Sequence, residues 1–196
     1  MKQNKSLLLT FVLLIVSAAL YRLIPSRPAG FAPQMAMALF GGAIIKDKLW
    51  AILLPIASLV VSDVLFELLF NAGLTGTHGF YQGQWAIYLT FVLVTFLGFA
   101  MKKVNVKNVA LFSITGSVIF FLLTNYITWK TGYGFARPQT WSGLMQCYVD
   151  ALAFYRTAGL IPGFFANFVL GDLVWSAVLF GGHYLLTRNK VTVAHA

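Results

Sequence analysis

Residues 49–70 read LWAILLPIASLVVSDVLFELLF. This stretch is long enough to cross the hydrocarbon core of a bilayer as a helix, which takes about 20 apolar residues. It nevertheless carries two carboxylates, Asp63 and Glu67, which lie four residues apart and therefore share one face of a helix. Charged side chains within a membrane usually face a protein interior or a water-filled cavity. We expect this face to border a solute-binding cavity. The alternative for Glu67 is a position at the level of the lipid headgroups, where a charge costs little.

The composition indicates an integral membrane protein. Of the 196 residues, 59% are hydrophobic and 10% are charged, and the mean hydropathy is +0.80. A soluble domain has about 25% charged residues. The 14 basic residues are scattered between apolar segments, so the net charge of +9 does not indicate binding to nucleic acid. We therefore expect one all-α domain over residues 1–196, with the lipid bilayer as its surroundings.

Six segments are predicted to cross the membrane as a helical bundle. The first resembles a signal peptide in part, but its apolar run continues past the small residues, which favours a retained helix. Residues 141–156 form a further helix of mixed polarity, which we expect to lie on the extracytoplasmic side between the fifth and sixth spans. The expected spans are residues 7–24, 34–45, 49–70, 85–101, 109–129 and 163–186.

The distribution of basic residues predicts the orientation of the bundle. Six spans place both termini on one side, and nine basic residues then fall on that side against five on the other. Short cytoplasmic loops are enriched in Lys and Arg, so both termini are predicted to be cytoplasmic. The nine residues are Lys2, Lys5, Lys46, Lys48, Lys102, Lys103, Lys107, Arg188 and Lys190.

Polar residues on three of the spans would lie at a similar depth below the outer surface. At about 1.5 Å per residue, Asp63 and Asp172 lie about 10–14 Å from the outer ends of their helices. Asn125 and Asn167 lie nearer the same surface. We expect a polar pocket that opens to the outside, although hydrogen bonds between helices would explain the same residues.

Sequence signatures of common enzymes are missing. The chain has no phosphate-binding Gly-Lys-Ser/Thr loop, no HExxH and no Gly-x-Ser-x-Gly. We expect no catalysis and no built-in cofactor. Two alternatives stay open: an intramembrane enzyme that uses Asp63, Glu67 and Arg156, and an assembly protein without a ligand. His78 lies in a glycine-rich loop with Tyr81, where a lone histidine is more often solvated than a ligand.

Five segments together resemble a known family. They are RLIPSRPAGFAPQMAMALFGGA (22–43), LPIASLVVSD (54–63), FFLLTNYITW (120–129), GLMQCYVDALAFYR (143–156) and GDLVWSAVLFGG (171–182). In the same order over most of the chain, they resemble the substrate-binding S components of energy-coupling-factor (ECF) vitamin transporters. The resemblance implies a six-helix bundle in a bacterial inner membrane, with a vitamin-sized site on the extracytoplasmic side.

Within that family the chain is similar to solitary cobalamin transporters. The resemblance implies that Asp63, Tyr81 and Arg156 lie near a bound cobalamin. The cysteine that holds cobalt there is missing here, which leaves His78 as the candidate cobalt ligand. Ala32 and Ala36 resemble the surface that docks on an ECF coupling module. The predicted substrate-binding residues are Asp63, Glu67, His78, Tyr81, Asn125, Arg156 and Asp172.

Overall fold

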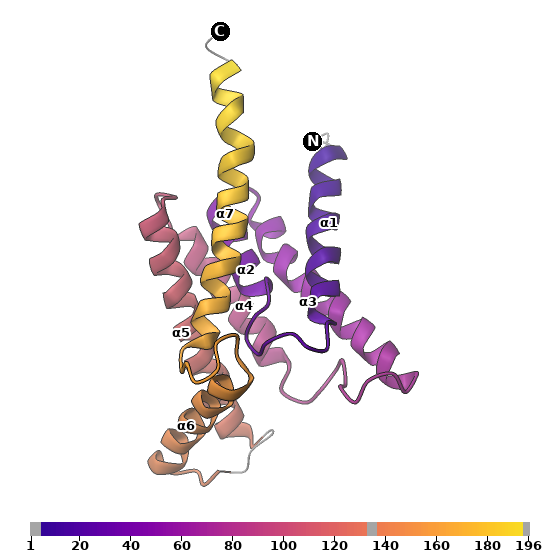
Figure 1. Cartoon of the computed structure of the whole chain (residues 1–196), viewed down its shortest axis with the longest axis vertical. Coiled ribbons are helices and arrows are strands. Elements are labelled where there is room, and N and C mark those ends of the chain that lie inside the picture. The colour runs from indigo at the N-terminus through magenta and orange to yellow at the C-terminus, as the bar shows by residue number, and fades with distance from the viewer. Residues whose placement is uncertain (1–4, 133–136, 194–196) are drawn as a thin grey trace.

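The structure is a computed structural model that describes residues 5–132 and 137–193, with side chains for residues 9–132 and 137–187. These ranges contain seven helices and no strand, which confirms the predicted all-α class (Figure 1). The helices are α1 (Lys5–Arg22), α2 (Gln34–Ile44), α3 (Lys48–Asn71), α4 (Trp85–Phe99), α5 (Val106–Thr131), α6 (Trp141–Ala158) and α7 (Asn167–Val193).

Three of the helices are long and apolar enough to cross a membrane. They are α3, α5 and the Asn167–Thr187 part of α7. The described parts of α1, α2 and α4 are apolar but shorter. The 11 residues of α2 extend about 16 Å along the helix axis. A complete crossing of the hydrocarbon core needs about 30 Å, so α2 is too short to cross as a helix alone.

Local side-chain chemistry determines where several helices begin and end. Asp47 accepts hydrogen bonds from the backbone N–H groups of Leu49 and Trp50, and Thr140 accepts one from Gly143. These are N-cap bonds, which satisfy donors that have no partner within the helix. The predicted start of the last span at residue 163 is wrong. Gly163 has a φ of +83°, which is outside the helical region, and α7 begins at Asn167.

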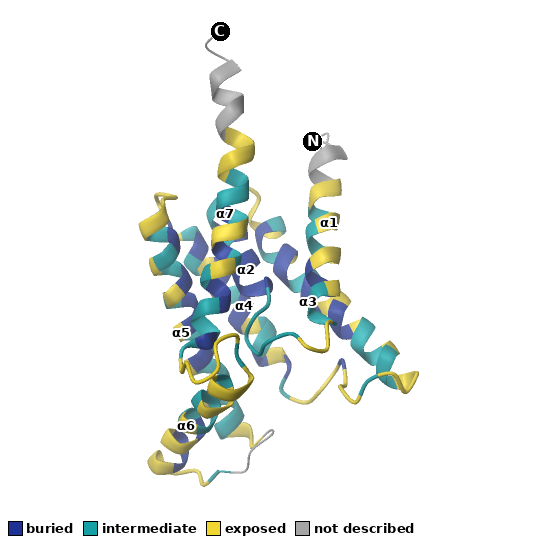
Figure 2. Cartoon of the chain, in the orientation of Figure 1, coloured by how far each residue is buried: buried dark blue, intermediate teal, exposed yellow. Residues whose placement is uncertain are grey.

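The short helix α2 forms the centre of the molecule and contacts α3, α4, α5 and α7. Eight of its residues are buried, which is visible as the dark blue central segment in Figure 2. Its closest neighbour is α4: a Cβ atom on Gly42 would lie 2.1 Å from the carbonyl oxygen of Thr95 and 2.8 Å from Gly98 Cα. Small residues allow this approach, so Gly42 and Gly98 serve packing between α2 and α4.

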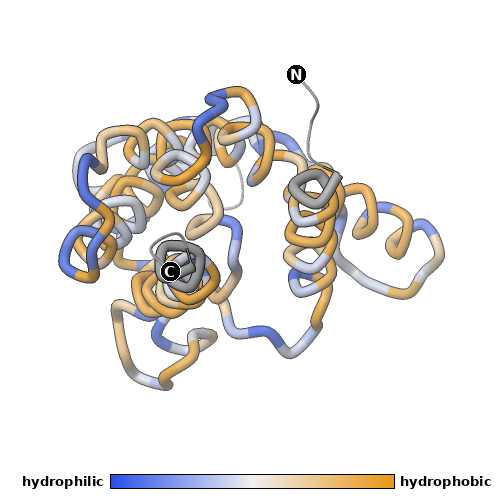
Figure 3. Tube along the Cα trace, turned by 90° about the horizontal axis from the view of Figure 1, so that it is seen from above, coloured by the Kyte–Doolittle hydropathy of each residue, from blue (hydrophilic) through white to orange (hydrophobic). Residues whose placement is uncertain are grey.

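The outer faces of the helices are apolar as well. Leu13 on α1, Val64 on α3, Phe96 on α4, Leu111 on α5 and Val178 on α7 are each exposed. Figure 3 shows the same pattern along the chain, with hydrophobic colour dominating the helices. Exposed apolar side chains on this scale are typical of a surface that contacts lipid.

The two ends of the molecule differ. The described parts of the chain begin in α1 and finish in α7 at the same end of the molecule (Figure 1). Helix α6 lies at the opposite end, where it packs against α5 and, less extensively, α7. The described ends of the chain, in α1 and α7, thus lie opposite α6.

Substitution of Gly42 by alanine should destabilise the fold. The added methyl group has no space against Thr95, and overpacking of this kind costs about 1–3 kcal/mol. We expect a lower melting temperature of the detergent-purified protein. Gly181→Ala on α7 is the matched control, because a Cβ there meets nothing within 4 Å and should not lower the melting temperature. Equal melting temperatures for the two variants would contradict the proposed α2–α4 contact.

Candidate solute-binding cavity

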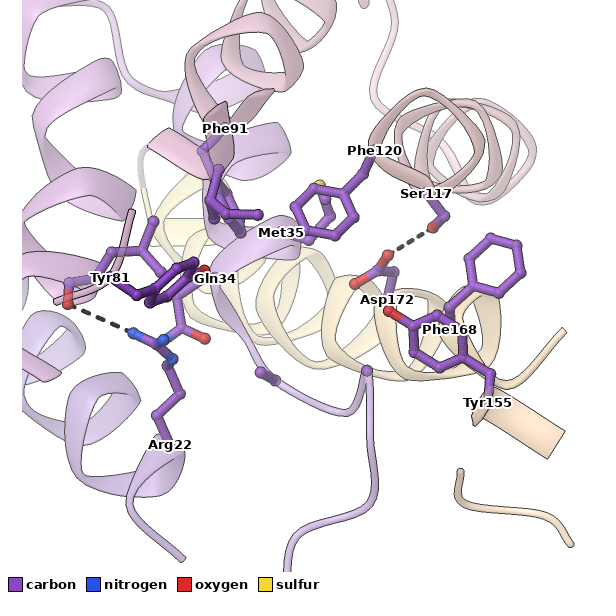
Figure 4. A pocket seen from close by; sticks show the side chains of 14 residues that line it. Arg22, Gln34, Met35, Tyr81, Phe91, Ser117, Phe120, Tyr155, Phe168 and Asp172 are labelled. Atoms are coloured by element: carbon purple, nitrogen blue, oxygen red, sulfur yellow. Dashed lines mark hydrogen bonds between the residues drawn. The ribbon is translucent and has the colours of Figure 1, made fainter. Parts of the chain in front are cut away.

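A cavity of about 240 Å³ lies between the helices, and all seven helices described above contribute to its lining (Figure 4). Its walls come from residues far apart in the sequence, so the cavity exists only in the folded bundle. One lining residue from each of α1 to α7, in order, is Arg22, Gln34, Leu59, Ile87, Ser117, Tyr155 and Asp172.

The middle of the cavity is apolar and largely aromatic. Met35, Phe91 and Phe120 form one wall, and Phe168 and Tyr155 lie toward the other end (Figure 4). Arg22 and Gln34 lie at one polar end, while Asp172 and Ser117 lie at the other. The cavity is therefore apolar in its middle and has polar side chains at both ends.

The first polar end depends on an ion pair between Arg22 and Asp63. The distance from Arg22 Nη1 to Asp63 Oδ1 is 2.6 Å, and the Asp63 side chain is only 2% exposed. The other carboxylate oxygen accepts hydrogen bonds from Gln84 Nε2 at 2.6 Å and Tyr88 Oη at 2.5 Å. Arg22 Nη1 also contacts Ser62 Oγ. Both carboxylate oxygens of Asp63 thus have hydrogen-bond partners, and Arg22 is the member of this ion pair that lines the cavity.

Gln34 adds a free acceptor at the same end. Its Nε2 atom donates to the carbonyl of Ala18 at 3.0 Å and to Ser58 Oγ at 3.2 Å. The residue is 1% exposed, and its Oε1 atom has no hydrogen-bond partner among the described residues. Because an unsatisfied buried acceptor is costly, this oxygen is suited to accept a hydrogen bond from a bound solute.

The second polar end is Asp172 on α7. Its Oδ2 atom accepts a hydrogen bond of 2.6 Å from Ser117 Oγ on α5. The residue is 6% exposed and forms no ion pair with a side chain in the described ranges. The Tyr155 hydroxyl points toward it (Figure 4). One carboxylate oxygen of Asp172 is therefore available to a solute.

The loop between α1 and α2 closes the cavity on one side. Gly30 has a φ of +73°, and a Cβ atom there would lie 3.0 Å from the Tyr155 ring. Arg27 donates from Nη1 to the carbonyl of Phe31 at 3.2 Å. The loop thus passes close to α6 and α7 because a glycine allows it.

Two of the predicted substrate-binding residues, Tyr81 and Asp172, line the cavity. Asp63 lies behind Arg22 and reaches the cavity only through that ion pair. Glu67 instead stabilises the α3–α4 loop, because its Oε2 atom accepts from the backbone N–H of Gly79 at 2.9 Å. His78 packs on the Phe70 ring with centroids 3.6 Å apart, and its Nδ1 atom lies 3.7 Å from Glu67 Oε2.

The other predicted residues lie elsewhere. Asn125 donates to the carbonyl of Phe121 within its own helix at 2.8 Å. Arg156 is exposed and lines a separate hollow of about 410 Å³. Ala36 is buried, and Ala32 precedes α2 and lines the cavity, so these two alanines do not form an exposed docking surface. The residues proposed for the enzyme alternative, Asp63, Glu67 and Arg156, are thus not gathered in one cavity.

Sequence reasoning missed most of the lining. Arg22 lies at the end of an apolar segment, and Gln34 is the single strongly polar residue of another, so both carried a weak signal. Ser117 and Tyr155 carried none, because serine and tyrosine are common in membrane helices and at their ends. Across the described ranges, no group of three or more His, Cys, Asp or Glu residues could hold a metal ion.

Comparison with known proteins places the chain in one family. A family model described as "Family of unknown function (DUF6580)" matches residues 2–194. No curated protein and no solved structure matches the chain.

Replacement of Asp63 by alanine should strongly destabilise the protein. The variant leaves Arg22, Gln84 and Tyr88 without their shared acceptor, and removal of one partner of a buried ion pair costs about 3–5 kcal/mol. Thermal unfolding in detergent would measure the loss. The double variant Arg22→Met/Asp63→Leu should recover part of it, because no charge is then left unpaired.

Asp150→Ala is the control for this prediction. Asp150 pairs with Arg137 at 2.5 Å on a more exposed surface, where ion pairs contribute little. A melting temperature for Asp63→Ala as high as that of Asp150→Ala would contradict the structural role of the Arg22–Asp63 pair.

Proposed function

We propose that this chain, which belongs to the DUF6580 family, binds a small organic solute within the membrane and helps to carry it inward. The observation that carries the proposal is the cavity itself. It is lined by all seven described helices and contains two buried polar side chains with free acceptor atoms, Gln34 and Asp172. A mostly apolar cavity with a few convergent polar groups is the usual form of a small-molecule site.

The proposed membrane arrangement is a bundle of six crossing segments in a bacterial inner membrane, with both termini cytoplasmic and α6 on the extracytoplasmic side. The three long apolar helices and the apolar outer faces support it. The short α2 crosses together with the loop that precedes it. Non-helical backbone at membrane depth is tolerated where it is buried in protein or lines a cavity, and Gly30 and Ala32 of this loop line the cavity.

The size of the cavity supports a solute smaller than cobalamin. A volume of about 240 Å³ accommodates a single or double ring but not a corrin with its side chains. No histidine is part of the cavity lining, and His78 packs against Phe70 instead. Cobalamin held by His78 therefore stays a prediction from the family resemblance, and the geometry supports a compact vitamin-like solute.

Movement of the solute would follow capture from the outside. Tyr81 comes from the α3–α4 loop, is 55% exposed, and lines both this cavity and a neighbouring hollow of about 420 Å³. A loop residue at this position is suited to control access. Docking on an ECF coupling module would need a surface other than Ala32 and Ala36.

Filling the cavity should abolish solute binding without loss of the fold. Ala32→Leu places a larger side chain in the cavity, and Ala100→Leu adds the same volume at an exposed position at the end of α4. Native mass spectrometry of the protein purified in mild detergent should show a bound small molecule on the wild type and on Ala100→Leu. The adduct should be missing from Ala32→Leu.

Two results would contradict the proposed function. One is a wild-type protein that carries no adduct and binds nothing from a library of vitamins and polar metabolites. The other is an adduct that persists in Ala32→Leu at the wild-type level, which would place the solute outside this cavity.

The cobalamin prediction has its own test. Protein incubated with hydroxocobalamin and separated from free ligand should show a corrin absorbance spectrum if His78 coordinates cobalt, and the spectrum should change in His78→Ala. We expect no retained corrin, because the cavity is too small for it. Retained corrin with a spectrum that depends on His78 would restore cobalamin as the ligand.

A further inference from the structure

We infer that the solute is a small organic cation whose protonated nitrogen donates a hydrogen bond to Asp172. This inference rests on the proposed function and names the chemical class of its solute. Its basis is the difference between two buried carboxylates, Asp63 behind Arg22 and Asp172 in the cavity lining. One is fully paired within the protein, and the other has a free oxygen beside an open volume.

Only one of the two buried carboxylates has a cationic partner among the described residues. Arg22 and Asp63 form a direct ion pair, so the Arg22 end of the cavity is close to neutral. Asp172 has a hydrogen bond from Ser117 but no cationic partner in the part of the chain that the structure describes. Arg27 on the nearby loop directs its Nη1 atom to the Phe31 carbonyl. An ionised carboxylate that is buried without a partner is costly, and a cationic solute would supply the partner that stabilises the ionised form of Asp172.

Hydrogen-bond capacity favours a solute with N–H donors. The free oxygen of Asp172 and the Oε1 atom of Gln34 are both acceptors at the cavity, and Gln34 Oε1 has no donor among the described residues. Protonated amines, amidines and guanidines supply such donors. A neutral acceptor-rich solute would leave both oxygens unsatisfied, which is costly in a buried site.

The walls suit the body of such a cation. Phe120, Tyr155 and Phe168 surround Asp172 (Figure 4), and the Tyr155 and Phe168 ring centroids are 5.5 Å apart. Aromatic faces attract cations electrostatically, and they also bury an apolar ring. A flat cation with one apolar side matches both features of this end of the cavity.

Benzamidine and benzamide provide a direct test, because they have nearly the same shape and differ in charge at neutral pH. Isothermal titration calorimetry with the full-length protein in detergent would measure both affinities. We expect benzamidine to bind and benzamide to bind roughly tenfold or more weakly, since hydrogen bonds between charged partners are about twice as strong as neutral ones. This comparison uses only the wild type and does not depend on the folding of a variant.

Asp172→Asn is the test of the residue, and Asp47→Asn is its matched control. Both remove one negative charge, but Asp47 is an exposed N-cap of α3 where asparagine caps equally well. We expect benzamidine affinity to fall roughly tenfold to hundredfold in Asp172→Asn, as charged hydrogen bonds imply, and to be unchanged in Asp47→Asn.

Three outcomes would overturn the inference: equal affinities for benzamidine and benzamide, no measurable benzamidine binding, or unchanged affinity in Asp172→Asn. Failure of this inference can be distinguished from failure of the proposed function. If native mass spectrometry finds a neutral or anionic solute that Ala32→Leu excludes, the cavity is a solute site but the solute is not a cation.

Discussion

The Arg22–Asp63 ion pair is the interaction on which the cavity depends. A carboxylate inside an apolar bundle is tolerated only when its oxygens are hydrogen-bonded and its charge is balanced. Asp63 on α3 meets both conditions through Arg22 on α1 and through Gln84 and Tyr88 at the start of α4. The same contacts join α1, α3 and the start of α4. They also hold the Arg22 guanidinium at the edge of the cavity, where it closes one polar end.

The central position of α2 explains why there is an open volume at all. Gly42 and Gly98 bring α2 and α4 into backbone contact on one side. Helix α2 is short and begins at Gln34, so the chain before Gln34 is a loop and not a continuation of the helix. The space left there is bordered by the loop through Gly30 and by the aromatic side chains of α5, α6 and α7. Close packing in one part of the bundle thus accompanies a cavity in another.

Asp63 and Asp172 show how neighbours decide what a buried carboxylate does. Both are almost completely buried, and both lie well inside apolar helices. Asp63 is enclosed by protein donors and contributes to stability. Asp172 has one donor, Ser117, and an oxygen beside the cavity, and it therefore contributes to binding in the proposed function. An amphipathic cavity with a carboxyl group that has no cationic partner among the described residues is a strong constraint on the class of solute that enters it.

The sequence by itself determined the membrane character, the helical class, the positions of most helices and two lining residues, Tyr81 and Asp172. All but Tyr81 follow from length, hydropathy and the high cost of a charge in an apolar segment, which are properties of local sequence. Tyr81 was predicted from the family resemblance. Only the tertiary structure decided that Asp63 is paired with Arg22, that Glu67 and His78 belong to a loop contact, and that Arg156 lies outside the cavity. It also supplied Gln34, Ser117 and Tyr155. The physical reason is that a hydrogen-bond partner is defined by proximity in space, and these partners are separated by up to 55 residues in the chain.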